Sequence, residues 1–97
     1  MKLHVGHADE YRRRHDAIWP ELKNLLSENG IRDYSIFIDE QTHDLFGILE
    51  IDNPKKLNAL SAEPVMKKWW YYMKDIMETN PDDSPLSTPL KEVFYLP

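Results

Sequence analysis

The sequence predicts a small α+β domain in which helices cover one face of an antiparallel sheet. Three observations support this fold class. Apolar residues recur at helical spacing before Gly30 and again after Pro64. Between them, residues 34–39 and 45–51 form two short runs rich in aromatic and β-branched residues, as strands are. Only a short polar connection separates the two runs, so we expect them to pair as a hairpin.

The first part of the chain is expected to form one short strand and a broken helix. Residues 1–5 alternate weakly between polar and apolar, which fits a short strand. Helical spacing follows at Tyr11, Ile18, Leu22, Leu25 and Leu26. Pro20 interrupts that helix because proline lacks the N–H that would bond the carbonyl of Asp16. We therefore expect a kink or restart near residues 19–20 and a helix end at residues 29–30.

The second part is expected to add two helices, a loop and a last strand. Gly47 marks a bulge or a close approach within the second strand of the hairpin. Pro54 should open a short helix, and a longer one should run over residues 65–77. Residues 80–89 are rich in Asn, Pro, Asp and Ser, which predicts an irregular loop. Residues 92–96 then look like a closing strand.

The predicted order β-α-β-β-α-β is that of a ferredoxin-like antiparallel sandwich with its helices on one face of the sheet. The other face carries Phe46 and Ile48 or their alternates. Such an apolar face needs a cover, and a second subunit is the simplest one. The sequence thus favours a dimer.

The composition limits the classes of protein to which this chain can belong. The 97 residues fit one domain, residues 1–97, and 41% hydrophobic residues can form one modest core. A formal charge of −5 argues against nucleic acid or an anionic membrane as the main partner. We find no apolar run long enough for a membrane span or a signal sequence. Without cysteine there is no disulfide framework or thiolate metal site, which is compatible with a cytoplasmic location.

Two adjacent tryptophans, Trp69 and Trp70, are the most informative pair in the chain. Successive helical positions point about 100° apart, so both cannot face one core. If one is buried, the other lies on a flank or lines a cavity. Neighbouring aromatic residues on an acidic chain suggest a flat-faced ligand such as a sugar ring. A core tryptophan with an exposed neighbour is an equally weighted alternative.

Tyr11 and His15 are candidates for chemistry because they lie four residues apart on the apolar stripe of the first helix. Histidine is the side chain best suited to proton transfer near neutral pH. From the residues alone, a hydrogen-bonded structural histidine is about twice as plausible as a catalytic one. If the fold gathers this pair with Tyr34 and the two tryptophans, the pocket would bind a neutral polyol and move protons.

Other polar clusters are assigned to the surface. Residues 12–14 are three successive arginines that fan around the helix next to several acidic residues, which predicts a solvated face. His4 and His7 straddle Gly6, and without a helical frame or a cysteine a metal site is improbable. His43 falls in the hairpin turn. No glycine-rich phosphate loop or serine elbow is present.

Several motifs occur together along nearly the whole chain. They are Arg-Arg-His at 13–15, Ile-Trp-Pro at 18–20, Asp-Tyr-Ser-Ile at 33–36, Lys-Trp-Trp at 68–70, Asn-Pro-Asp-Asp-Ser-Pro at 80–85 and Phe-Tyr-Leu-Pro at 94–97. In this order and spacing the sequence resembles the L-rhamnose mutarotase family. Members of that family usually carry several residues ahead of the position of Met1, so the first strand is expected to be short.

The resemblance implies a homodimeric ferredoxin-like protein of the dimeric α+β barrel type that interconverts the α and β anomers of L-rhamnose. By the same resemblance, His15 is the proton donor, and the sugar is contacted by Tyr11, Tyr34, Trp69 and Trp70. Changing anomers requires only proton transfers that open and close the ring, so no metal or other cofactor is expected.

Two other functions stay open at this stage. A cofactor-free monooxygenase or haem-handling protein on the same fold would need an oxidisable aromatic substrate and a deeper apolar pocket; only fold analogy supports it. A non-enzymatic sugar-binding or dimeric interaction module would use the aromatic residues as a platform. It predicts saturable binding of rhamnose without faster anomer exchange.

Overall fold

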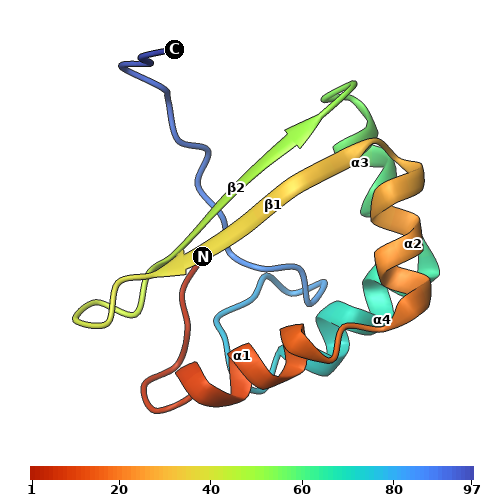
Figure 1. Cartoon of the computed structure of the whole chain (residues 1–97). Coiled ribbons are helices and arrows are strands. Elements are labelled where there is room, and N and C mark those ends of the chain that lie inside the picture. The colour runs from red at the N-terminus through yellow and green to blue at the C-terminus, as the bar shows by residue number, and fades with distance from the viewer.

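The structure is a computed structural model that describes residues 1–97, and its helices lie on one side of a long antiparallel hairpin (Figure 1). The helices are α1 (Ala8–Asp16), α2 (Pro20–Glu28), α3 (Lys56–Leu60) and α4 (Pro64–Met73), and the strands are β1 (Ile31–Ile38) and β2 (Leu45–Ile51). The predicted α+β class is confirmed. No helix combines the length and the apolar character needed to cross a membrane.

The predicted break at Pro20 separates α1 from α2. Trp19 is extended, with φ −61° and ψ 133°, and Pro20 occupies the start of α2, where its missing N–H has no helical partner to lose. The α2 helix then ends at Glu28, and Gly30 has φ 77°. A Cβ at Gly30 would lie 2.6 Å from Oδ2 of Asp52, so only glycine fits this turn into β1.

The hairpin forms as predicted, although β1 begins three residues earlier than expected. Ile36 pairs with Gly47, and Phe37 pairs with Phe46. His43 adopts a positive φ of 65° in the turn between the strands. The hairpin supplies the concave wall that faces the helices.

The two predicted outer strands differ from expectation. Lys2 and Leu3 form only isolated bridges, to Asp44 and Met77 respectively. The prediction of a strand over residues 92–96 is wrong: this segment is exposed and carries no strand pairing. It runs away from the body of the molecule (Figure 1). Strand propensity alone is insufficient here, because a strand exists only where a segment pairs with another one, and residues 92–96 pair with no part of the chain.

The core lies between the hairpin and the helices. Leu3, Leu22, Met73 and Ile76 are each no more than 2% exposed. The predicted helix over residues 65–77 ends early, at Met73, yet the turns that follow still bury Ile76 and Met77.

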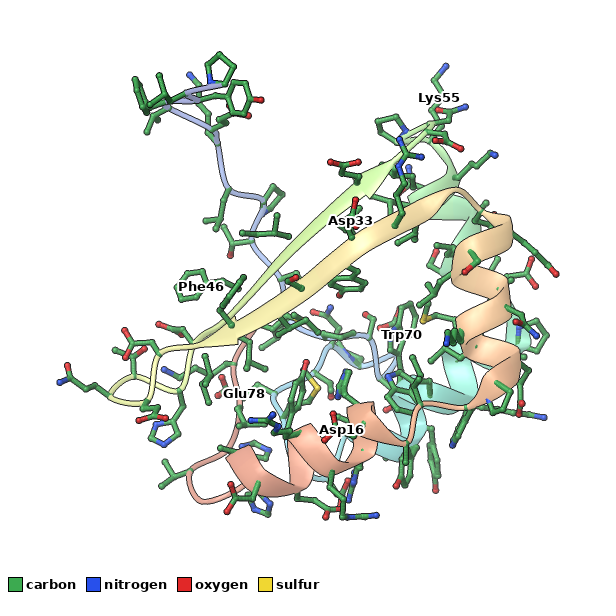
Figure 2. The ribbon with its side chains drawn as sticks, viewed as in Figure 1. Asp16, Asp33, Phe46, Lys55, Trp70 and Glu78 are labelled. Carbon is green, nitrogen blue, oxygen red and sulfur yellow. The ribbon has the colours of Figure 1, made fainter.

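The outer face of the hairpin is uncovered. Phe37, Phe46 and Ile48 are 57%, 41% and 62% exposed. Figure 2 shows Phe46 on the side of the sheet away from the helices, whereas Trp70 lies between sheet and helices. We call these three residues the outer patch. Its apolar character is unusual for a surface that faces only water.

Candidate active site

One cavity of about 1040 Å³ opens between the inner face of the hairpin and helices α1, α2 and α4. Most of its lining is apolar. All five residues that the sequence singled out lie around it: Tyr11, His15, Tyr34, Trp69 and Trp70. They come from α1, β1 and α4, so the fold brings together groups that are far apart in the chain.

Tyr11 and His15 form one stacked unit on α1. Their ring centroids are 4.2 Å apart with planes 28° apart, as expected for residues one helical turn apart. Nδ1 of His15 lies 2.9 Å from the backbone carbonyl oxygen of Tyr11. A carbonyl only accepts, so in the neutral ring Nδ1 carries the proton and Nε2 holds the free electron pair. Nε2 makes no hydrogen bond within the chain, which leaves it available to a ligand.

The surroundings of His15 favour the neutral imidazole. Burial lowers the pKa of His15 below its ordinary value and outweighs the Tyr11 carbonyl and the Asp16 carboxylate, which act in the opposite direction. A neutral ring with a free Nε2 is ready to accept a proton. The neutral form of His15 therefore presents an unprotonated Nε2 that can accept a proton.

The two tryptophans differ in their surroundings: Trp69 belongs to the core, and Trp70 is a half-buried residue at the cavity. Trp69 is only 7% exposed and packs edge-on against His15 and Trp19, with centroids 5.4 Å and 5.1 Å away. Trp70 is half-buried and lies in the space between the sheet and α1 (Figure 2). Trp69 thus packs against the imidazole of His15, while Trp70 lines the cavity.

Two tyrosines add hydroxyl groups. The pKa of Tyr11 is raised strongly and that of Tyr34 is also raised, in both cases chiefly by burial. Tyr34 as a whole is 44% exposed, and it also lines the cavity. Both phenols stay protonated at neutral pH and can donate hydrogen bonds to a ligand oxygen.

The prediction that residues 12–14 form a solvated face is wrong for Arg14. Its side chain donates to Glu10 at 2.8 Å, to the backbone carbonyl of Tyr72 at 2.7 Å and to Asp75 at 2.8 and 3.1 Å. Its guanidinium also lies 4.5 Å from the ring centre of Tyr72. Arg14 is 8% exposed and clamps α1, which carries His15, to the end of α4, which carries the tryptophans.

Replacing Arg14 by methionine should destabilise the fold by about 2 kcal/mol, because hydrogen bonds to charged groups contribute roughly 1.5–3 kcal/mol net. The freed carboxylates of Glu10 and Asp75 can be hydrated, which limits the loss. Urea unfolding measures the effect, with Arg12→Met as the matched control on the exposed side of α1. Equal unfolding midpoints for the two variants would contradict the clamp.

Sequence reasoning missed two features of the site. The burial of Arg14 depends on Asp75, 61 residues away, and nothing local separates it from its two arginine neighbours. Asp33 has a positive φ of 51° directly before Tyr34. An aspartate inside an otherwise β-rich run was an available signal, because Asp tolerates this backbone region better than most residues.

Comparisons with known proteins agree with one another. A sequence model of the family described as L-rhamnose mutarotase matches residues 1–96. The L-rhamnose mutarotases of Flavobacterium johnsoniae and Brucella anthropi are each 56% identical, over 99% and 100% of this chain and 90% and 92% of theirs. The crystal structure of L-rhamnose mutarotase from Formosa agariphila superimposes with a TM-score of 0.92 at 49% identity, covering all of this chain and 93% of that one.

Proposed function

This chain belongs to the L-rhamnose mutarotase family, and on that premise we propose that it interconverts the α and β anomers of L-rhamnose in the cavity between sheet and helices. It is an isomerase. The observation that carries the proposal is the free Nε2 of a neutral His15 at a cavity lined with aromatic and hydroxyl groups.

In the proposed mechanism, one histidine moves the proton in both directions. Nε2 of His15 takes the proton from the C1 hydroxyl, the ring C1–O5 bond breaks, and the resulting imidazolium donates the same proton to O5. The open-chain aldehyde then rotates about C1–C2 and recloses by the reverse steps. O1 and O5 are bonded to the same carbon, so one imidazole can reach both. His15 is thereby the proton donor to the ring oxygen, and the Tyr11 carbonyl stabilises the cation at Nδ1.

The other site residues bind and orient the sugar. Tyrosines with raised pKa values are poor bases, so we assign Tyr11 and Tyr34 to donating hydrogen bonds rather than to taking the hydroxyl proton. Trp70 would stack on the apolar face of the pyranose, including the methyl group of a 6-deoxy sugar. Trp69 would contact the sugar only at its edge, since most of its surface is buried.

The catalysed rate should fall on acidification, with a midpoint below about 6.5, the ordinary pKa of histidine. Only neutral His15 accepts the hydroxyl proton, and burial lowers its pKa in the folded state. For the same reason, folding stability should decrease as pH falls from about 6.5 toward the folded pKa, because the unfolded chain binds the proton more tightly there. Polarimetry at several pH values, corrected for the spontaneous rate, measures kcat/KM; a rate that rises toward pH 5 would contradict the proposal.

We further propose that residues 1–97 act as one domain in a homodimer and take part in cytoplasmic rhamnose metabolism. The outer patch supports the dimer, because a two-stranded hairpin with one exposed apolar face is only marginally stable in water. The exposed apolar side chains of Val93, Phe94 and Leu96 are further surface that a second copy could cover. The lack of cysteine is compatible with the cytoplasm.

The direct test follows L-rhamnose dissolved as a single anomer. Approach to equilibrium, recorded by polarimetry, should accelerate in proportion to protein concentration and saturate with sugar. Saturable binding without acceleration would favour the non-enzymatic sugar-binding module instead. Spectral titration with haem addresses the remaining alternative, for which a stoichiometric absorbance shift would be the signature.

A further inference from the structure

Strand β1 contains one more residue than its partner strand over the same length. Arg32 pairs with Glu50, and Ser35 pairs with Ile48. Three steps along β1 therefore match two steps along β2. This is a β-bulge, which redirects the side chains that follow it.

Asp33 supplies the backbone conformation of the bulge. Its φ of 51° lies in the left-handed region, which costs most residues roughly 1–2 kcal/mol but which Asp and Asn tolerate better. Asp33 is exposed and lies on β1 (Figure 2). The burial of its side chain therefore does not account for its presence in the strand.

The bulge reverses the alternation of β1 at Tyr34. Ile31 is 8% exposed and must face the helices, because the outer face of the hairpin is uncovered. Ile36 also packs against the core, although it lies an odd number of residues further on. In an unbroken strand these two would face opposite sides. The extra residue puts Tyr34, two before Ile36, on the side of the cavity.

Gly47 provides the room into which Tyr34 turns. A Cβ at Gly47 would meet Cε1 of Tyr34 at 3.4 Å and its hydroxyl oxygen at 3.6 Å. The tyrosine ring thus lies over a strand position that has no side chain. This explains the glycine in β2, where it otherwise weakens a strand.

We infer that Asp33 and Gly47 are positioning residues of the sugar site: the bulge at Asp33 aims Tyr34 into the cavity, and Gly47 leaves the space that its ring occupies. This inference rests on the proposed binding role of Tyr34. In a regular strand Ile31 and Tyr34 could not both face the helices, so with Ile31 kept buried the Tyr34 hydroxyl would turn toward the outer face and the cavity would lose one of its hydrogen-bond donors.

The test compares Asp33→Gly with Asp33→Val. Glycine accepts the left-handed conformation freely, so KM for L-rhamnose should stay within about twofold of wild type. Valine is β-branched and opposes that conformation, so it should straighten the strand and raise KM about tenfold, the same effect that we expect of Tyr34→Ala, with kcat changed less. Ser35→Val, which adds the same side chain at a regular strand position, is the matched control.

A double-mutant cycle separates positioning from a merely structural role. In a Tyr34→Ala background, Asp33→Val should raise KM by less than about twofold further, because the residue that it misdirects is already gone. An equal tenfold rise in both backgrounds would overturn the inference. An unchanged KM in Asp33→Val alone would overturn it as well.

A proton NMR contact gives a readout that does not depend on activity. In wild type and Asp33→Gly, the Tyr34 ring protons should show a nuclear Overhauser effect to the Gly47 α protons, and in Asp33→Val this effect should vanish. Its persistence there would refute the bulge argument even if wild type fails to accelerate mutarotation. Should Asp33→Val not fold, Gly47→Val tests the same space: its methyl groups should displace the ring and raise KM, while an unchanged KM would overturn the role of Gly47.

Discussion

His15→Ala should reduce the catalysed anomer exchange of L-rhamnose by a factor of about 10²–10⁴, the usual contribution of one positioned acid/base group. The rest of the cavity would remain, so sugar binding should change far less than the rate. The fold should also remain, because His15 is only half-buried and its hydrogen bond is to a carbonyl within its own helix.

The controls for this variant separate chemistry from charge and packing. His4→Ala removes an exposed histidine and should leave the rate unchanged. His15→Gln keeps a donor for the Tyr11 carbonyl but cannot shuttle a proton, so its rate should match that of His15→Ala. Full activity in either His15 variant would remove this residue from the mechanism.

Trp69→Ala should mainly lower stability, whereas Trp70→Ala should mainly weaken sugar binding. Trp69 is a core residue, so its removal should destabilise the chain by about 3–5 kcal/mol, as Trp-to-Ala changes in cores do. In a domain of this size each kcal/mol lowers Tm by roughly 4–8 °C, so the melting temperature should fall by more than about 10 °C.

Trp70→Ala should instead weaken sugar binding by about tenfold, because a stacked aromatic face contributes roughly 1 kcal/mol beyond the area it buries. Thermal melting and sugar titration of both variants measure the two effects. Tyr71→Ala, at an exposed neighbouring position of α4, should change neither. If Trp70→Ala lowers Tm as much as Trp69→Ala does, Trp70 belongs to the core and not to the site.

Much of the architecture was predictable because its signals are local. Proline breaks a helix at any interior position, so Pro20 interrupts the first helical run. The change to β-branched and aromatic residues marks the hairpin. The close approach at Gly47 was also foreseen. These features depend on backbone chemistry that a short window of sequence contains.

The features that sequence reasoning misjudged depend on distant partners. Residues 92–96 have strand propensity, but a strand also requires a pairing partner, and this segment pairs with no part of the chain. Arg14 looks like its neighbours until the end of α4 brings Asp75 beside it. Which of Trp69 and Trp70 is buried likewise depends on how α1 and α4 pack.

The site likewise combines features that the sequence predicts with features that only the folded structure reveals. Its residue types and the helical pairing of Tyr11 with His15 could be read along the chain, whereas the state of the imidazole could not. The hydrogen bond to the Tyr11 carbonyl sets the tautomer, and burial lowers the pKa of His15. The hydrogen bond is local to α1, whereas the burial arises only once the cavity is assembled.

The most direct test of the central claim is proton NMR magnetisation exchange between the two anomeric signals of L-rhamnose at equilibrium. Wild type and His15→Ala would be compared at matched concentration, with circular dichroism to establish that both are folded. The proposal predicts that wild type enhances exchange and that the variant returns it to the spontaneous rate. Exchange by folded wild type no faster than in buffer would contradict the proposal.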